Sequence, residues 1–165
     1  MVWNIFFLSI IKASKSLEGY LYSKSKSRFV YFEEFSYKDK TRAYLIDSPK
    51  TYFSTKKENN NYIIKERNSD DNEVVSIGDS VYENMMLKTD YKQNKAGQLF
   101  TFDRKDDEDD TFKIKNNNKC LESGPVEPFF AECTESIHQI WAFFSEPEVK
   151  EITEILKKGI EMKKI

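Results

Sequence analysis

The stretch KCLESGPVEPFFAECTESIHQIWAFF, Lys119–Phe144, decides the fold of this chain. It contains two short apolar segments, which carry Cys120 and Cys133, and then the tripeptide Gln-Ile-Trp at positions 139–141. Short segments in which aromatic and β-branched residues alternate with polar ones are typical of half-buried β-strands. The stretch therefore predicts short strands joined by turns.

Weaker copies of this pattern lie upstream, in the same order each time. Gln98-Leu99-Phe100 matches Gln139-Ile140-Trp141, because each has an aromatic residue two positions after a glutamine. Arg42-Ala43-Tyr44 matches less closely, with an arginine in place of the glutamine. The other matched segments are Val74–Gly78 with Cys120–Gly124 and Tyr20–Lys24, and Asn84–Thr89 with Pro128–Cys133 and Phe29–Glu33. The spacings differ, so insertions must lie in loops, which tolerate them at small cost.

Three copies can bury a surface that one copy leaves exposed. Alternation puts Phe100 and Phe102, or Trp141 and Phe143, on one face of a strand. Three repeats can close a small barrel around such faces. We predict that Tyr44, Phe100 and Trp141 are equivalent core residues of this barrel, because packing explains buried aromatics better than ligand stacking does.

The order C-L-E … C … Q-x-W resembles one repeat of the ricin-B-type lectins, whose pattern C-L-D … C … Q-x-W recurs in a three-fold β-trefoil. The resemblance implies an all-β fold, a β-trefoil of three pseudo-repeats over residues 14–145. It also implies a disulfide between Cys120 and Cys133, which fall on the positions that many family repeats bridge. Gln139 corresponds to a family position that mostly makes structural hydrogen bonds, so the Q-x-W match indicates fold more than function.

The resemblance implies a sugar site in the third repeat. Glu122 takes the place of the family aspartate and keeps a carboxylate that can accept hydrogen bonds from sugar hydroxyls. The family's stacking aromatic falls on Ala131, for which Phe129 is a nearby substitute, and His138 takes the place of the family asparagine. The predicted sugar-binding residues are Glu122, Phe129, His138 and Gln139.

Two classes of function follow. Tyr22 and Ser76 occupy the acid position in repeats one and two, so only the third repeat is expected to bind. The first class is a secreted module that binds a carbohydrate or glycoprotein. The second is a trefoil that presents loops to a protein partner, as inhibitor-like and cytokine-like trefoils do. Fold alone does not choose between them.

Composition and charge argue against other classes. The chain has 165 residues and a net charge of −2, and its basic run at positions 24–28 is no longer than a turn, so no nucleic-acid partner is predicted. His138 is the only histidine and no phosphate-binding glycine loop is present, so no enzyme activity, cofactor or metal site is predicted. The acidic run Asp103–Asp110 lacks the EF-hand spacing and glycine and is predicted to be a solvated loop.

The apolar N-terminus has two interpretations. Residues 2–11 are almost wholly apolar but too few to span a membrane, which fits a secretory signal peptide over residues 1–13. Alternatively, Ser9–Lys12 resembles Asn61–Lys65, the expected opening strand of repeat two, and opens repeat one. If the signal peptide is present, that strand is shortened or replaced by Ser14–Glu18.

Residues 146–165 predict a C-terminal amphipathic α-helix. Ser145 and Glu148 have the spacing of a capping box. Apolar residues then recur at helical spacing, at Val149, Ile152, Leu156 and Ile160. We expect the helix to cover the barrel or its open end with this stripe, and the alternative is that it docks a partner.

Overall fold

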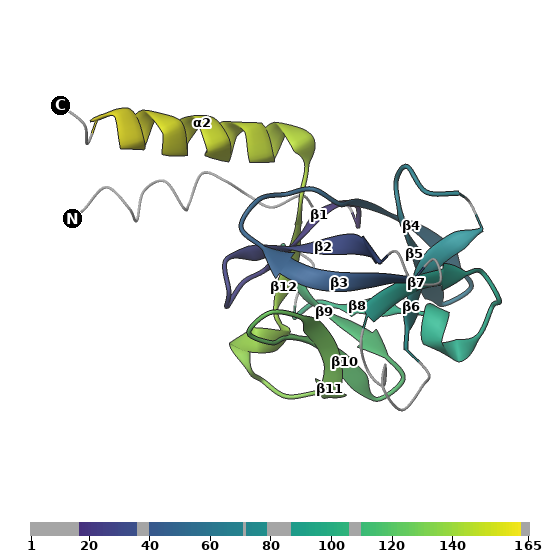
Figure 1. The fold of residues 1–165 in the computed structure, drawn as a ribbon. Coiled ribbons are helices and arrows are strands. Elements are labelled where there is room, and N and C mark those ends of the chain that lie inside the picture. Colours follow the sequence, from purple (N-terminus) through teal and green to yellow (C-terminus); the bar gives the residue numbers. More distant parts are fainter. Residues whose placement is uncertain (1–16, 36–39, 71, 79–86, 106–109, 163–165) are drawn as a thin grey trace.

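The computed structural model describes residues 17–35, 40–70, 72–78, 87–105 and 110–162 (Figure 1). These residues form twelve strands, two short 3-10 helices and one α-helix. The strands are β1 (Gly19–Ser23), β2 (Arg28–Phe35), β3 (Lys40–Ile46), β4 (Tyr52–Glu58), β5 (Asn61–Glu66), β6 (Glu73–Ile77), β7 (Leu87–Tyr91), β8 (Thr101–Asp103), β9 (Thr111–Asn116), β10 (Lys119–Ser123), β11 (Pro128–Glu132) and β12 (Trp141–Phe144). The helices are η1 (Ala96–Gln98), η2 (Ile137–Gln139) and α2 (Glu146–Met162).

Six strands pair in a closed ring, in the order β1, β4, β5, β8, β9, β12 and back to β1. Between β5 and β8 the ring is closed by one isolated bridge, which pairs Tyr62 with Phe100. There the amide of Tyr62 donates to the carbonyl of Phe100 over 2.7 Å, and the amide of Phe100 donates back over 2.9 Å. Closure satisfies the strand edges that an open sheet would expose.

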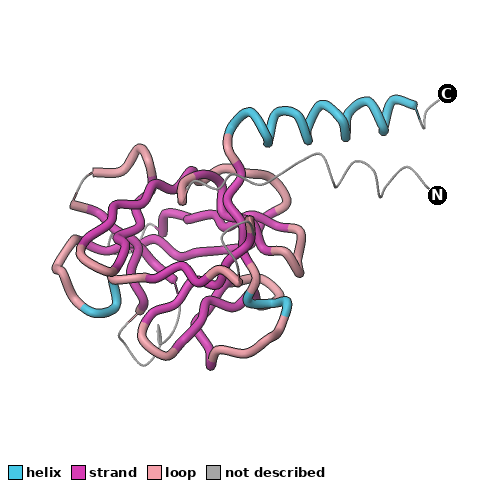
Figure 2. The backbone as a smooth tube through the Cα atoms, turned by 180° about the vertical axis from the view of Figure 1, so that it is seen from behind, coloured by secondary structure: helices cyan, strands magenta, loops and turns pink. Residues whose placement is uncertain are grey.

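The other six strands form three hairpins, β2–β3, β6–β7 and β10–β11, one for each third of the chain. Two of these hairpins touch where Arg42 of β3 pairs with Lys88 of β7. Each third of the chain thus supplies two barrel strands with a hairpin between them. This is the predicted β-trefoil, and Figure 2 shows its strands wrapped around one centre.

The barrel interior confirms two of the three predicted core residues. Phe100 and Trp141 are both 0% exposed. The Trp141 indole Nε1 donates to the carbonyl of Leu121 over 2.8 Å, which satisfies the only polar atom of the ring. The larger apolar side chains packed with them are Leu21, Val30, Phe32, Leu45, Phe53, Ile64, Val75, Leu87, Phe112, Ile114, Leu121, Phe130 and Phe143.

The glutamines of the two Q-x-aromatic tripeptides make equivalent hydrogen bonds. Gln139 accepts from the amide of Thr134 and donates to the carbonyl of Glu132. Gln98 accepts from the amide of Gln93 and donates to the carbonyl of Tyr91. In both cases the partners lie five and seven residues upstream and the glutamine is fully buried. The motif therefore closes the turn that leads into the last strand of a repeat.

The prediction for Tyr44 is wrong. Among the described side chains of β3, those of Ala43 and Leu45 are buried, so alternation leaves Tyr44 half-buried on the outer face. The residue that matches Phe100 and Trp141 at the start of a last strand is Phe53, which is 1% exposed. Its tripeptide begins with Thr51, a threonine in place of the glutamine, so the sequence pattern was lost in this repeat.

This error shifted the predicted strands of the first repeat by one. Tyr20–Lys24 was matched to a second strand, but β1 opens the repeat, and β2 and β3 form its hairpin. The opening strand is therefore Gly19–Ser23, later in the chain than either expected segment. The proposed signal peptide, residues 1–13, and the alternative strand Ser9–Lys12 both lie outside the described residues.

The predicted disulfide is present. Cys120 of β10 is bonded to Cys133, which follows β11 directly, with a Cα–Cα distance of 5.0 Å. It fastens the outer side of the third hairpin, and its Cys120 end is fully buried.

The predicted helix α2 begins with the predicted capping box. The amide of Glu148 donates to Ser145 Oγ over 3.4 Å, and the amide of Ser145 donates to Glu148 Oε2 over 2.5 Å. Arg67, at the end of β5, pairs with Glu146 over 2.6 Å and holds the first turn. From there α2 extends past the barrel instead of lying across it (Figures 1 and 2), contrary to the expected packing.

Candidate functional site

The third hairpin brings Glu122 and Phe129 together. Glu122 of β10 is the direct cross-strand partner of Phe129 of β11. Their neighbours Leu121 and Phe130 are 1% and 2% exposed and face the core. Alternation therefore puts Glu122 and Phe129 side by side on the outer face, where both are half-buried.

Gln139 positions the carboxylate of Glu122. Its Nε2 donates to Glu122 Oε2 over 2.8 Å, in addition to its bond to the carbonyl of Glu132. Gln139 is fully buried, so it acts through Glu122. Within the part of the chain that the structure describes, Glu122 Oε1 has no protein hydrogen-bond partner and can accept one from a ligand.

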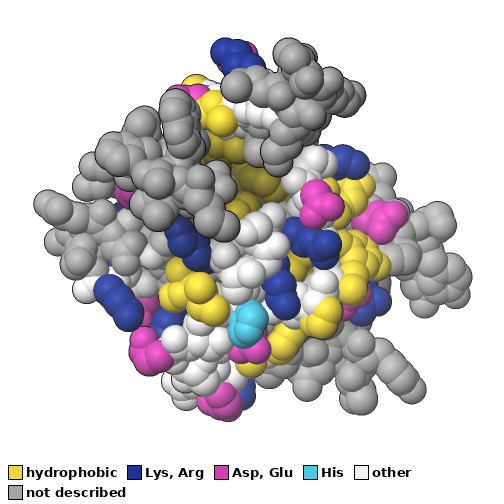
Figure 3. All heavy atoms as spheres, turned by 90° about the vertical axis from the view of Figure 1, so that its left-hand side faces the viewer, with side chains coloured by type: hydrophobic (Ala, Val, Ile, Leu, Met, Phe, Trp, Pro, Cys, Tyr) yellow, Lys and Arg dark blue, Asp and Glu magenta, His cyan; other side chains and the backbone are white. Residues whose placement is uncertain are grey.

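His138 lies on η2, directly before Gln139, and a residue from the first repeat orients its ring. His138 Nδ1 is 2.9 Å from Ser25 Oγ in the β1–β2 turn. Ser25 Oγ is also 2.9 Å from Ser123 Oγ, and Ser123 Oγ donates to the His138 carbonyl over 2.9 Å. Figure 3 shows the histidine (cyan) at the surface, next to acidic and basic side chains. Ser25 is 113 residues from His138, and nothing in the sequence indicated this contact.

The turn before β11 keeps the Phe129 ring in place. A Cβ at Gly124 would lie 3.0 Å from Phe129 Cε1 and 2.7 Å from the carbonyl oxygen of Glu127. Glycine is therefore needed where the ring approaches the turn. Ala131, at the stacking position that the resemblance implies, pairs with Cys120 and provides no aromatic face.

The equivalent cross-strand pairs of the other repeats carry different chemistry. In the second repeat the pair is Ser76 with Lys88. In the first repeat it is Tyr31 with Tyr44, and Lys50 Nζ lies 5.3 Å from the centre of the Tyr31 ring. In the first repeat, the residue equivalent to Glu122 is thus Tyr31. The sequence comparison had assigned Tyr22 to this position. Among these three described pairs, only Glu122–Phe129 combines a carboxylate with an aromatic ring.

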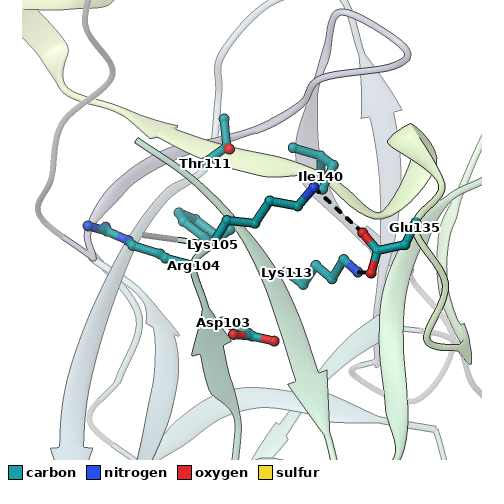
Figure 4. Close-up of a pocket in the computed structure, with 8 residues that line it drawn as sticks. Asp103, Arg104, Lys105, Thr111, Lys113, Glu135 and Ile140 are labelled. Carbon is teal, nitrogen blue, oxygen red and sulfur yellow. Dashed lines mark hydrogen bonds and ion pairs between the residues drawn. The ribbon is translucent and has the colours of Figure 1, made fainter. Parts of the chain in front are cut away.

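A pocket of about 270 Å³ lies between the ends of β8 and β9 and the segment around η2 (Figure 4). Its lining residues come from the end of β8, the start of β9 and the segment around η2, and they are Asp103, Arg104, Lys105, Thr111, Phe112, Lys113, Glu135 and Ile140. The sequence gives no sign of this pocket, because the acidic run Asp103–Asp110 is typical of a solvated loop. Asp103 instead ends β8, and Asp106–Asp109 lie outside the described residues.

Glu135 is the charged centre of the pocket. Its carboxylate lies 3.3 Å from Lys113 Nζ and 3.6 Å from Lys105 Nζ, and Figure 4 shows both ammonium groups directed at it. The hydrogen bond from Lys113 and the positive charges of Lys113 and Lys105 lower the pKa of Glu135. The side chains around it thus create a positive potential.

No family model and no curated protein matches the chain. Solved structures are similar to it in fold. A Culex quinquefasciatus salivary protein of the cysteine and tryptophan-rich family has a TM-score of 0.64 at 13% identity, over 76% of this chain and 91% of that one. The BEL β-trefoil gives 0.61 at 14% identity, over 79% and 94%. A proteinase inhibitor from Coprinopsis cinerea gives 0.56 at 13% identity, over 78% and 97%. At these identities the likeness shows the fold: the chain is a β-trefoil.

Proposed function

We propose that this chain is a secreted, non-enzymatic carbohydrate-binding module of ricin-B-lectin type, with a single sugar site in its third repeat. The observation that carries the proposal is the Glu122–Phe129 pair, in which a positioned carboxylate lies beside an aromatic ring on the outer face of a hairpin. Such a pair offers a sugar both an acceptor for its hydroxyl groups and an apolar surface for its ring.

Each residue of the site has a distinct role in this proposal. Glu122 Oε1 accepts a hydrogen bond from a hydroxyl group of the sugar, while Gln139 holds Oε2. Phe129 packs against the C–H face of the sugar, and the free side of the His138 ring adds a second polar contact. One open site immobilises little surface, so the dissociation constant is expected near the millimolar range.

The contact between Ser25 and His138 does not make a hydrolase in this proposal. Ser25 Oγ is shared with Ser123 Oγ, and the described residues place no carboxylate on His138 to orient it as a general base. Secretion is supported by the disulfide, since such bonds persist mainly in oxidising compartments. No helix within the described residues is long and apolar enough to cross a membrane.

We expect Glu122→Ala to abolish sugar binding and leave the fold intact, because it removes the hydroxyl acceptor but only a half-buried surface group. Titrations with simple galactosides and with longer glycans, followed by protein NMR, measure this. Glu151→Ala, which removes an exposed carboxylate from α2, is the matched control and should bind like the wild type. Equal binding by wild type and Glu122→Ala would refute the assigned site.

A second candidate function is a protein-interaction module without sugar binding. Val126 and Ile137 are each 56% exposed, in the β10–β11 turn and on η2. Exposed aliphatic residues on loops suit a protein partner better than a sugar. A similar solved trefoil is a proteinase inhibitor. If the wild type binds no glycan in the titration above, this function takes precedence, and proteinase inhibition is the first assay.

A further inference from the structure

The pocket between β8, β9 and η2 combines an apolar wall with positive charge. Ile140 is half-buried and provides this wall. Phe112 closes the base, but it is 1% exposed and belongs to the barrel core, and Arg104 lies over its ring at 5.9 Å from the centre, so it offers a ligand almost no surface. The volume, about 270 Å³, is just below the range of pockets that hold drug-sized ligands, so it suits one small ring with its substituents.

The charges of the pocket favour an anion. Lys105 and Lys113 line the pocket together with two carboxylates, those of Asp103 and Glu135. Asp103 is paired with Lys115 over 2.6 Å, outside this set. Glu135 is then the one carboxylate left to neutralise Lys105 and Lys113 within the described lining.

The two lysines differ in how firmly they are held. The Lys113 side chain is 13% exposed, and its ammonium group also donates to the carbonyl of Thr134 over 2.6 Å. Lys105 and Glu135 are 76% and 81% exposed. Ion pairs between exposed side chains contribute little, so an incoming anionic group can displace Glu135 from Lys105 at small cost. Lys113, which the carbonyl of Thr134 holds in place, is then the fixed cation of the site.

One residue links this pocket to the third-repeat site. The amide of Thr134 donates to Gln139 Oε1, and the carbonyl of Thr134 accepts from Lys113 Nζ. The segment from Glu132 to Ile140 therefore forms a wall between the two sites. A ligand in the pocket needs no contact with Glu122.

We propose that this pocket is a second binding site that takes the sulfate or carboxylate group of an acidic saccharide. The acidic group binds between Lys105 and Lys113 in place of the Glu135 carboxylate, and the sugar ring packs against Ile140. Glu135 acts as an internal competitor, so the site is self-neutralised without ligand. This site is independent of the proposed site at Glu122 and Phe129.

The test is a titration of the full chain at low salt with galactose 6-sulfate, with sodium sulfate and with galactose. Backbone amide shifts of Arg104, Thr111 and Lys113, which line the pocket and are remote in sequence from His138 and Gln139, report on binding. We expect galactose 6-sulfate to bind more tightly than sodium sulfate and galactose to leave these amides unchanged. Added sodium chloride should weaken binding, because exposed charges are screened. Equal binding of sulfate and galactose 6-sulfate would overturn the saccharide assignment, and no shift with either would overturn the site.

Two variants separate this role from a structural one. Glu135→Gln removes the competing carboxylate and should tighten binding of galactose 6-sulfate by about two- to five-fold, while Lys105→Gln should weaken it by a similar factor. Lys57→Gln and Glu151→Gln make the same charge changes at exposed positions elsewhere and should have no effect. Unchanged or weaker binding by Glu135→Gln contradicts the proposal. Glu122→Ala should retain this binding, so a loss of binding at one site can be distinguished from a loss at the other.

Discussion

Replacing Trp141 by alanine is expected to lower the free energy of unfolding by about 3–5 kcal/mol, the usual cost of deleting a large core aromatic. Trp141 is 0% exposed, and its indole donates to the carbonyl of Leu121. The variant would lose packing across the barrel and leave that buried carbonyl without its partner. Urea denaturation followed by circular dichroism measures the difference. A cost below about 1 kcal/mol would contradict a core position, since that is the range of ordinary surface substitutions.

The same measurement tests the strand order of the first repeat. Phe53→Ala should cost as much as Trp141→Ala, because Phe53 occupies the equivalent position and is 1% exposed. Tyr44→Ala is the matched control, since it removes a ring of similar size from a half-buried position on β3. It should cost clearly less. If Tyr44→Ala were the more damaging of the two, the β2–β3 hairpin would be wrongly placed.

Loss of the disulfide is the second large expected effect. The double variant Cys120→Ala with Cys133→Ala should lose about 3 kcal/mol of stability, the chain-entropy estimate for a loop of this size. The bond joins residues 13 apart and closes the outer side of the third hairpin. Urea denaturation of the wild type with and without reductant gives an independent value.

The double variant also supplies the control for that experiment. Reductant should destabilise the wild type and leave the double variant unchanged, because no other disulfide is present among the described residues. Equal stability of the oxidised wild type and the double variant would show that the bond does not stabilise the trefoil. Because Glu122 lies on β10, two residues after Cys120, any sugar binding should weaken along with the hairpin.

The sequence was most informative where side chains make local hydrogen bonds. Gln98 and Gln139 each bind backbone groups five and seven residues upstream, so the motif and the turn that it closes occupy one short stretch. Two repeats could therefore be recognised by eye. The capping box of Ser145 and Glu148 likewise set the start of α2, because both partners lie within one helical turn.

The first repeat shows where this kind of reasoning fails. Thr51 replaces the glutamine and still accepts a backbone hydrogen bond, from Phe32, but a lone threonine gives no recognisable pattern. Tyr44 and Phe53 are both aromatic residues near polar ones, and strand alternation alone cannot tell which faces inward. The pairing of β3 and β4 with their neighbouring strands determines which ring faces inward, and this pairing joins residues that are far apart in the sequence.

The sequence by itself determined the all-β class, the core positions Phe100 and Trp141, the C-terminal helix and, through the family resemblance, the disulfide. Only the tertiary structure decided the inward face of β3, the course of α2 away from the barrel, the contact of Ser25 with His138 and the pocket around Glu135. The physical reason is distance along the chain. Turns and helix caps depend on residues that are close in the sequence, whereas the sites form where hairpins and loops from different repeats meet after the barrel closes.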